Sequence, residues 1–221
     1  MDGTSRQTRE EVQANALKFL SEVKSAKRNG LFIDCGSNIG QAFKFFKDYY
    51  PLNLCDYVLI EPNPFCLPLL MKIREDIGEK IEIIPAAAAA HNGTTKFYGL
   101  VEDKRGSLSD GGSILQIHNS LFYMADAQKA LTVRTFSLSD FIKAKIKQGY
   151  SYITLKLDIE GSEYEVLEDL IMHNLHRHLA AMYVEFHSRY MSDCYRKRYE
   201  KIELRLLTKL REDGVRFTLW I

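Results

Sequence analysis

The sequence predicts an α/β fold in which a mostly parallel sheet is covered by helices on both faces. Short, continuously apolar strands at residues 31–33, 56–61 and 81–84 alternate with helical segments. Strands that are apolar at every position are typical of parallel sheets buried on both sides. A glycine-containing turn joins the first of these strands to the next helix, as in many nucleotide-binding α/β domains.

The composition is that of one globular domain. The chain has 221 residues, of which 46% are hydrophobic and 27% are charged. The formal net charge is +1, which excludes a bulk electrostatic attraction to nucleic acid or membrane. No apolar run approaches the ~20 residues that span a bilayer, and residues 1–11 do not resemble a signal peptide. We therefore expect no membrane partner.

The cysteines predict a reducing, cytoplasmic compartment. Cys35, Cys55, Cys66 and Cys194 are scattered without a C-x-x-C spacing. Such thiols are expected to be free, and their spacing argues against a zinc site.

We expect an N-terminal helix over residues 1–29, packed on a domain over residues 30–221. Apolar residues recur at helical spacing from Val12 to Val23. Ser162 and Glu165 predict a capping box. Residues 102–120 are polar and rich in glycine and serine, and we expect a long mobile loop that acts as a lid or is simply disordered. Further helices are expected at residues 41–50, 65–76, 138–147, 162–174 and 195–212, and further strands at 95–100, 131–136, 152–158, 179–186 and 215–221.

The turn from Asp34 to Gly40 is a candidate cofactor loop. Gly36 permits a tight turn close to a ligand, and Gly40 permits close packing of the helix start. Asp34 stands where a dinucleotide-binding loop carries its first glycine, so its carboxylate would repel a pyrophosphate. S-adenosylmethionine has a cationic amine and sulfonium and no phosphate, and we expect this cofactor.

Glu61 is the expected partner of that loop. It ends the next strand, 21 residues after Gly40, where an acid is placed to bind ribose hydroxyls. The turn that contains Pro62 and Asn63 would fix its carboxylate. Five alanines, Ala86–Ala90, follow the third strand. They are either a helix-prone turn or a surface on which an adenine ring lies.

A charged strand is expected at residues 154–160. Lys156, Asp158 and Glu160 point to one face by the period-two rule, and buried charges are costly unless they are paired. We therefore expect this strand to end at an open cleft, beside Glu185 and His187 of the following strand. Lys156 could pair with Glu185, and Asp158 lies near enough to join this pair. The alternative is an ion-pair network that only shapes the sheet.

The order of several segments resembles the FkbM family of methyltransferases. The resemblance covers about residues 31–187, and its most specific part is the K-x-D-x-E-G-x-E stretch. The matching segments are residues 32–40 (FIDCGSNIG), 60–64 (IEPNP), 91–98 (HNGTTKFY), 138–142 (LSDFI), 155–167 (LKLDIEGSEYEVL) and 184–187 (VEFH).

The resemblance implies a Rossmann-like class I methyltransferase fold, S-adenosylmethionine as cofactor, and methylation of a hydroxyl on a sugar or small molecule. Ser162 stands where the family commonly has alanine. One strand is visible near the C-terminus where class I sheets usually have a hairpin, so the alternatives are a shortened sheet or a chain truncated after Ile221. The candidate cofactor-binding residues are Asp34, Gly36, Ser37, Asn38, Gly40, Glu61, Pro62, Asn63, Ala86, Ala87 and Asp158.

The candidate catalytic residues are Asp158, His187, Lys156 and Glu185. Asp158 or His187 is expected to assist removal of the hydroxyl proton, with Lys156 and Glu185 organising the site. Asp158, Glu185 and His187 are not a firm metal-ligand set from sequence alone, and we expect no metal.

Three rival functions stay open at this point. A basic stretch that includes Arg189 and Arg196 would suit an RNA or ribose methyltransferase, although a solvated helix face is the usual explanation. A non-catalytic interaction subunit with a cofactor fold is the second. A nicotinamide dehydrogenase is the third, and Asp34 opposes it.

Overall fold

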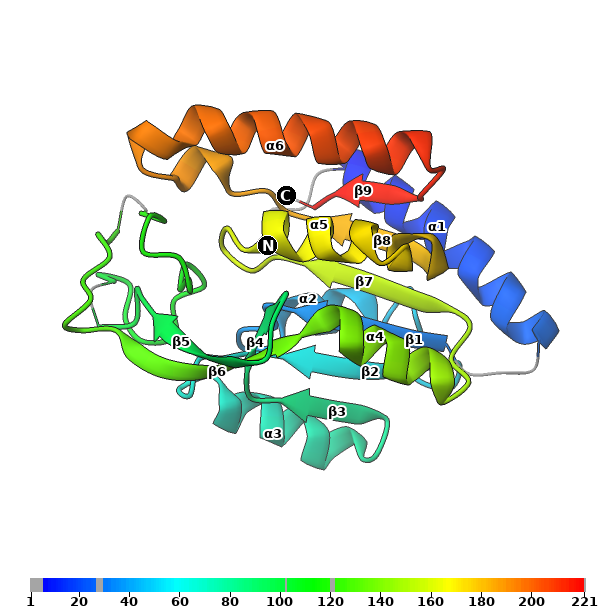
Figure 1. Cartoon of the computed structure of the whole chain (residues 1–221). Helices are drawn as coiled ribbons and strands as arrows, with labels where there is room; N and C mark the ends of the chain where they lie inside the picture. Colours follow the sequence, from blue (N-terminus) through cyan, green and yellow to red (C-terminus); the bar gives the residue numbers. More distant parts are fainter. Residues whose placement is uncertain (1–5, 27–29, 102, 120–121, 221) are drawn as a thin grey trace.

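The computed structural model describes residues 6–26, 30–101, 103–119 and 122–220. Its centre is a six-stranded sheet in which every neighbouring pair is parallel (Figure 1). The strands lie in the order β3 (Ile81–Ile84), β2 (Cys55–Ile60), β1 (Gly30–Cys35), β7 (Ile153–Leu157), β8 (Leu179–Val184) and β9 (Phe217–Leu219). The predicted fold class, a parallel sheet flanked by helices, is confirmed.

Helices cover both faces of this sheet because neighbouring strand residues point to opposite sides. Phe32 packs on one face with Phe46, whereas Leu31 and Ile33 belong to the core on the other face. The first core includes residues of α1 (Arg6–Ala26), α2 (Gln41–Phe46) and α3 (Leu67–Ile77). The second includes residues of α4 (Leu138–Lys147), α5 (Glu163–Met172) and α6 (Asp193–Glu212).

The N-terminal helix shares the core of the sheet. Val12, Phe19 and Val23 are fully buried, and α1 contacts β8 and β9. We infer that it is part of the same folding unit. The prediction of this helix extended to residues 27–29, which lie outside the described residues, as do 1–5.

A second, three-stranded sheet was not predicted. Its order is β4 (Ala87–Ala89), β6 (Leu131–Ser137) and β5 (Gly93–Phe97), and β5 runs antiparallel to β6. The alanine run is therefore a short strand and not a helical turn. Small side chains let this strand pass beside the end of the main sheet, where Ala87 and Ala88 are buried.

The predicted capping box at the start of α5 is wrong. The Ser162 hydroxyl makes no cap hydrogen bond and has no hydrogen-bond partner among the described residues. Glu165 lies instead near the exposed His91. The Glu163 carboxylate instead holds the turn before the helix, because it accepts hydrogen bonds from the backbone N–H groups of Ile159 (2.7 Å) and Gly161 (2.9 Å).

The C-terminal edge of the sheet carries β9, parallel to β8. The strand was predicted to extend to Ile221, which lies outside the described residues. Two short 3-10 helices, η1 (Leu175–His178) and η2 (Ser188–Tyr190), flank β8. Among the described residues, no helix is long and apolar enough to cross a membrane.

Candidate functional site

A cavity of about 510 Å³ opens at the carboxyl ends of the central strands. The strand order reverses between β1 and β7, and ligands of open α/β sheets bind at such a switch point. Asp158 follows β7 directly, and Glu185 and His187 follow β8. The predicted catalytic residues Lys156, Asp158, Glu185 and His187 all line this cavity.

The glycine turn after β1 is shaped by close contacts with the chain itself. Gly36 has φ 79°, and a Cβ there would lie 1.7 Å from the carbonyl oxygen of Asp158. Gly40 has φ 85°, and a Cβ there would lie 2.5 Å from Ile73 of α3. Both positions therefore require glycine. The turn lies at the cavity, where Gly36, Ser37 and Asn38 contribute to the lining.

Glu61 organises the turn beside the cavity. Its carboxylate accepts hydrogen bonds from the backbone N–H groups of Asn38 (2.7 Å) and Asn63 (2.8 Å). Burial raises the pKa of Glu61 to about 7, and these two hydrogen bonds oppose the shift. Glu61 itself does not line the cavity, although its neighbour Pro62 does.

The polar loop over residues 103–119 covers this region. Its backbone carbonyls at Ser107 and Ser109 accept hydrogen bonds from the side-chain amides of Asn63 (2.8 Å) and Asn38 (3.1 Å), respectively. Arg105 of the same loop lines the cavity. The loop therefore forms one wall of the site, as a binding loop would. The ends of the predicted loop, Glu102 and Ser120, lie outside the described residues.

Lys156 forms a buried ion-pair network with Asp158, which was expected near it, and with Asp34, which was not. Its ammonium lies 3.1 Å from Asp34 Oδ1 and 3.2 Å from Asp158 Oδ2. Burial by itself lowers the pKa of Lys156, but the Asp158 and Asp34 carboxylates raise it above its ordinary value. The expected pairing with Glu185 is wrong, because Glu185 follows the end of β8 and contacts Arg189 instead (3.0 Å).

Asp34 does not face the cavity. Its side chain is fully buried against Lys156, and it is not among the lining residues. Burial raises the pKa of Asp34, and the Lys156 ammonium opposes that shift. The expectation that this carboxylate meets a ligand directly is thus not supported by its position. Asp34 acts on the cavity only indirectly, because it pairs with Lys156, which in turn contacts Asp158.

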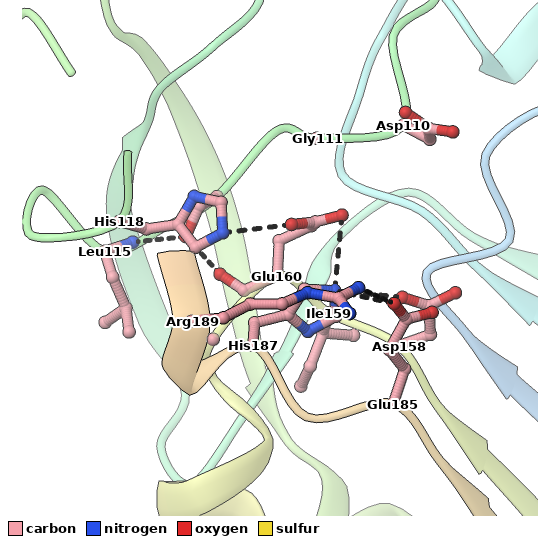
Figure 2. Close-up of polar contacts among 12 residues, drawn as sticks. Asp110, Gly111, Leu115, His118, Asp158, Ile159, Glu160, Glu185, His187 and Arg189 are labelled. Atoms are coloured by element: carbon pink, nitrogen blue, oxygen red, sulfur yellow. Dashed lines mark hydrogen bonds and ion pairs between the residues drawn. The ribbon is translucent and has the colours of Figure 1, made fainter. Parts of the chain in front are cut away.

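Four titratable side chains meet at the inner wall of the cavity, and we call Asp158, Glu160, Glu185 and His187 the acid–histidine cluster. Figure 2 shows His187 among the three carboxylates. Its Nε2 lies 3.5 Å from Glu160 and 3.7 Å from both Asp158 and Glu185. Burial by itself lowers the pKa of His187, but the surrounding carboxylates, with Glu163 foremost, raise it well above its ordinary value.

The carboxyls of the cluster are themselves perturbed. Burial raises the pKa of Glu160 to about 8 and that of Glu185 to about 7, and the charge of Asp158 adds to both shifts. Perturbed groups gathered at a cavity are typical of a functional site.

Sequence reasoning missed Glu163 and His118, which hold the cluster. Glu163 is fully buried and lies 3.0 Å from His187 Nδ1. Nε2 of His118 lies 3.0 Å from Glu160 (Figure 2), and its Nδ1 lies 3.0 Å from the Tyr123 hydroxyl. Glu163 is the last residue of the K-x-D-x-E-G-x-E stretch, which is a usable signal, whereas the solitary His118 in a loop carries none.

The cavity has little free positive charge. Among its lining residues the permanent cations are Lys156 and Arg105. Lys156 is committed to Asp34 and Asp158, and Arg105 lies 2.8 Å from Asp103 and 2.6 Å from Asp110. A pyrophosphate would therefore find no uncommitted lysine or arginine in this wall, whereas a cationic ligand would find carboxylates.

The predicted cofactor-binding residues divide into two groups. Those that line the cavity are Gly36, Ser37, Asn38, Pro62, Ala87 and Asp158. The others do not line it and are Asp34, Gly40, Glu61, Asn63 and Ala86.

The sequence is similar to one known protein family. The sequence profile of the methyltransferase FkbM domain matches residues 34–210. A solved structure, methyltransferase FkbM from Methylobacillus flagellatus KT, is similar with a TM-score of 0.39 and 16% identity. The match covers 64% of this chain and 29% of that one. No match is found among the curated proteins. The family match spans most of the chain, so the chain belongs to the methyltransferase FkbM family.

Proposed function

We propose that this methyltransferase uses S-adenosylmethionine and methylates a hydroxyl oxygen of a sugar or another small molecule. The observation that carries the proposal is the charge of the cavity. It offers the carboxylates of Asp158, Glu160 and Glu185 at the switch point of the sheet, while its lysine and arginine are neutralised by ion pairs.

The residues around the turn after β1 fit this cofactor. Glu61 is held beside the turn with each oxygen accepting one backbone hydrogen bond, which leaves lone pairs for ribose hydroxyls. Ala87 and Ala88 present a small, apolar wall on which an adenine ring would pack. Asp158 would attract the cationic end. When bound, S-adenosylmethionine supplies a methyl group on a positively charged sulfur.

The chain itself must orient the acceptor and assist loss of its proton. Asp158 and His187 reach the cavity; the Asp158 carboxylate would accept the proton, and His187, whose pKa the surrounding carboxylates raise well above its ordinary value, would assist by stabilising that carboxylate. Lys156 fixes the position of Asp158 through the 3.2 Å ion pair, and Glu185 completes the wall beside His187. Each of these roles is a part of the proposal.

Calorimetry with S-adenosylhomocysteine tests the cofactor. We expect saturable binding that weakens at least tenfold in Glu61→Ala, about 1.4 kcal/mol. NADH is the matched control, because its pyrophosphate should be rejected. Absence of S-adenosylhomocysteine binding to the folded wild-type protein would leave a non-catalytic subunit as the better explanation.

A screen of hydroxylated acceptors with labelled S-adenosylmethionine tests the reaction. Methyl transfer should be strongly reduced in Asp158→Asn and in His187→Ala, with binding of S-adenosylhomocysteine retained in His187→Ala. Full activity in both variants would contradict their proposed roles. Labelled RNA as the accepted substrate, with small hydroxylated acceptors unreactive, would favour the RNA methyltransferase alternative.

A further inference from the structure

We propose that Asp158, Glu185 and His187 bind a divalent metal cation at the inner wall of the cavity, where it would hold the hydroxyl oxygen of the acceptor. The role in methyl transfer rests on the proposed function, whereas the binding of the cation does not. The sequence alone predicted no metal, whereas the contacts of His187 in the structure favour one.

The three side chains converge closely enough to share one ion. One ligand atom from each of Asp158, Glu185 and His187 lies within 4.8 Å of the other two, and the imidazole Nε2 is 3.7 Å from both carboxylates. Ligand atoms at ~2.1 Å from a metal, at angles near 90–110°, are ~3.0–3.5 Å apart. A contraction of a few tenths of an ångström therefore brings this pair of distances to bonding geometry.

The orientation of His187 is the second, independent observation. Its side chain is nearly completely buried, and Glu163 lies 3.0 Å from Nδ1. Glu163 is held in turn by the N–H groups of Ile159 and Gly161. A carboxylate that accepts the Nδ1 proton leaves the Nε2 lone pair as the metal-binding atom, which is the arrangement found behind most histidine ligands.

The environment of Nε2 then requires a positive charge. Its nearest carboxylate oxygens are 3.5–3.7 Å away, longer than a hydrogen bond. A lone pair facing Asp158, Glu160 and Glu185 would be repelled by all three. A proton on Nε2 or a metal cation resolves this repulsion, and a metal ion ~2.1 Å from Nε2 would also bind carboxylate oxygens directly.

Two other cations touch the ligand set. Lys156 contacts the far oxygen of Asp158, which leaves the oxygen nearest Nε2 free. The exposed Arg189 contacts the same Glu185 oxygen that lies nearest Nε2, and it would swing into solvent when a metal binds. Glu160 faces His118 with its second oxygen, so it stands beside the ligand set as a further acceptor. Two carboxylates and one imidazole, without a thiolate, suit Mn²⁺ or Mg²⁺. The cation would leave positions open toward the cavity, where it would lower the pKa of a bound hydroxyl.

The test is a titration of the whole chain with Mn²⁺ alone, followed by electron paramagnetic resonance of the free ion. We expect one saturable site, displaced by excess Mg²⁺. The affinity should fall at least tenfold in Glu185→Gln and in His187→Gln. Glu165→Gln is the matched control, because this carboxylate also faces a histidine but lies on the surface, and its affinity should stay within twofold of wild type.

Thermal unfolding shows whether the variants are folded. Glu185→Gln removes one charge from a crowded set of acids, so without metal its midpoint should equal or exceed that of wild type. Mn²⁺ should then raise the midpoint of wild type and of Glu165→Gln, and should not raise that of Glu185→Gln. Equal Mn²⁺ affinity in wild type, Glu185→Gln and His187→Gln would overturn the proposal, and so would no binding to wild type.

Calorimetry with S-adenosylhomocysteine separates the two proposals. Binding of S-adenosylhomocysteine without Mn²⁺ binding overturns the cation site and leaves the proposed function in place. Mn²⁺ binding that depends on Glu185 and His187, without S-adenosylhomocysteine binding, supports the cation site and removes the proposed function.

Discussion

Replacing Lys156 with methionine tests how the buried charges at the switch point are held. Lys156 is 1% exposed and lies between Asp34 and Asp158. Methionine has a similar length and no charge, so Lys156→Met retains most of the packing. It leaves Asp34, which is fully buried and whose carboxylate oxygens make no hydrogen bond among the described residues. Asp158 is partly exposed and is solvated more easily.

The expected loss of stability follows from the buried Asp34 charge that Lys156→Met leaves without a partner. Removing one partner of a buried ion pair costs ~3–5 kcal/mol, because the other charge stays buried and uncompensated. For a chain of this size, each kcal/mol lowers the unfolding midpoint by ~2–4 °C, so we expect a fall of ~6–20 °C. The double variant Asp34→Asn/Lys156→Met leaves no charge at these two positions and should be more stable than Lys156→Met alone.

The assay is thermal unfolding at pH 7, followed by circular dichroism, of Asp34→Asn, of Lys156→Met and of the double variant. Lys80→Met is the matched control, since Lys80 pairs with Asp56 at 2.6 Å but is partly exposed, and its loss should cost only ~0–1 kcal/mol. The reasoning is refuted if Lys156→Met loses no more stability than Lys80→Met. It is also refuted if adding Asp34→Asn to Lys156→Met destabilises the protein further.

Three other perturbations have definite expected outcomes. Affinity for S-adenosylhomocysteine should rise ~tenfold from pH 6 to pH 8, because Glu61 with a pKa of about 7 must lose its proton to accept ribose hydroxyls; calorimetry of Glu61→Gln should show no such rise. Gly36→Ala should abolish folding or lower the midpoint by more than 5 °C, because a Cβ would meet the Asp158 carbonyl at 1.7 Å and φ is positive; an unchanged midpoint would contradict this. Ser162→Ala should change stability by less than ~0.5 kcal/mol in urea denaturation, since its hydroxyl makes no cap; a loss near 1 kcal/mol would restore the capping box.

Periodicity predicted the main sheet well because its strands are buried on both faces. Strand β1 is buried at every residue, which matches the apolar run from which it was predicted, and β7 is equally buried although Lys156 lies within it. In the second sheet, strands were expected at residues 95–100 and 131–136, near β5 and at β6, but β4 and the separation of these strands from the main sheet were not. Strand β5 has only one fully buried residue, Phe97, and β4 is three alanines, which have no preference for a strand.

The candidate site was predicted by position but not by partner. The rule that parallel strands end at one edge placed Asp158, Glu185 and His187 together without any structure. Whether Lys156 can pair with Glu185 depends on where β8 ends. The β8 strand ends at Val184. The Glu185 N–H still donates to the Leu157 carbonyl (2.9 Å), but the strand does not continue, so the period-two rule no longer gives the direction of the Glu185 side chain. Asp34 lies beside Lys156 in the β1–β7 register, which the sequence does not reveal.

The burial of Asp34 changes why this loop suits a cationic cofactor. An aspartate at the end of β1 was expected to repel phosphate directly, yet its carboxylate is sealed behind Lys156. The ion pair with Asp34 takes up the charge of the single buried ammonium at the switch point, so that ammonium is not available to a phosphate. Asp158 then faces the cavity beside two further carboxylates. Under the proposed function, discrimination against phosphate would therefore arise because Asp34 neutralises a lysine, and not because Asp34 touches the ligand.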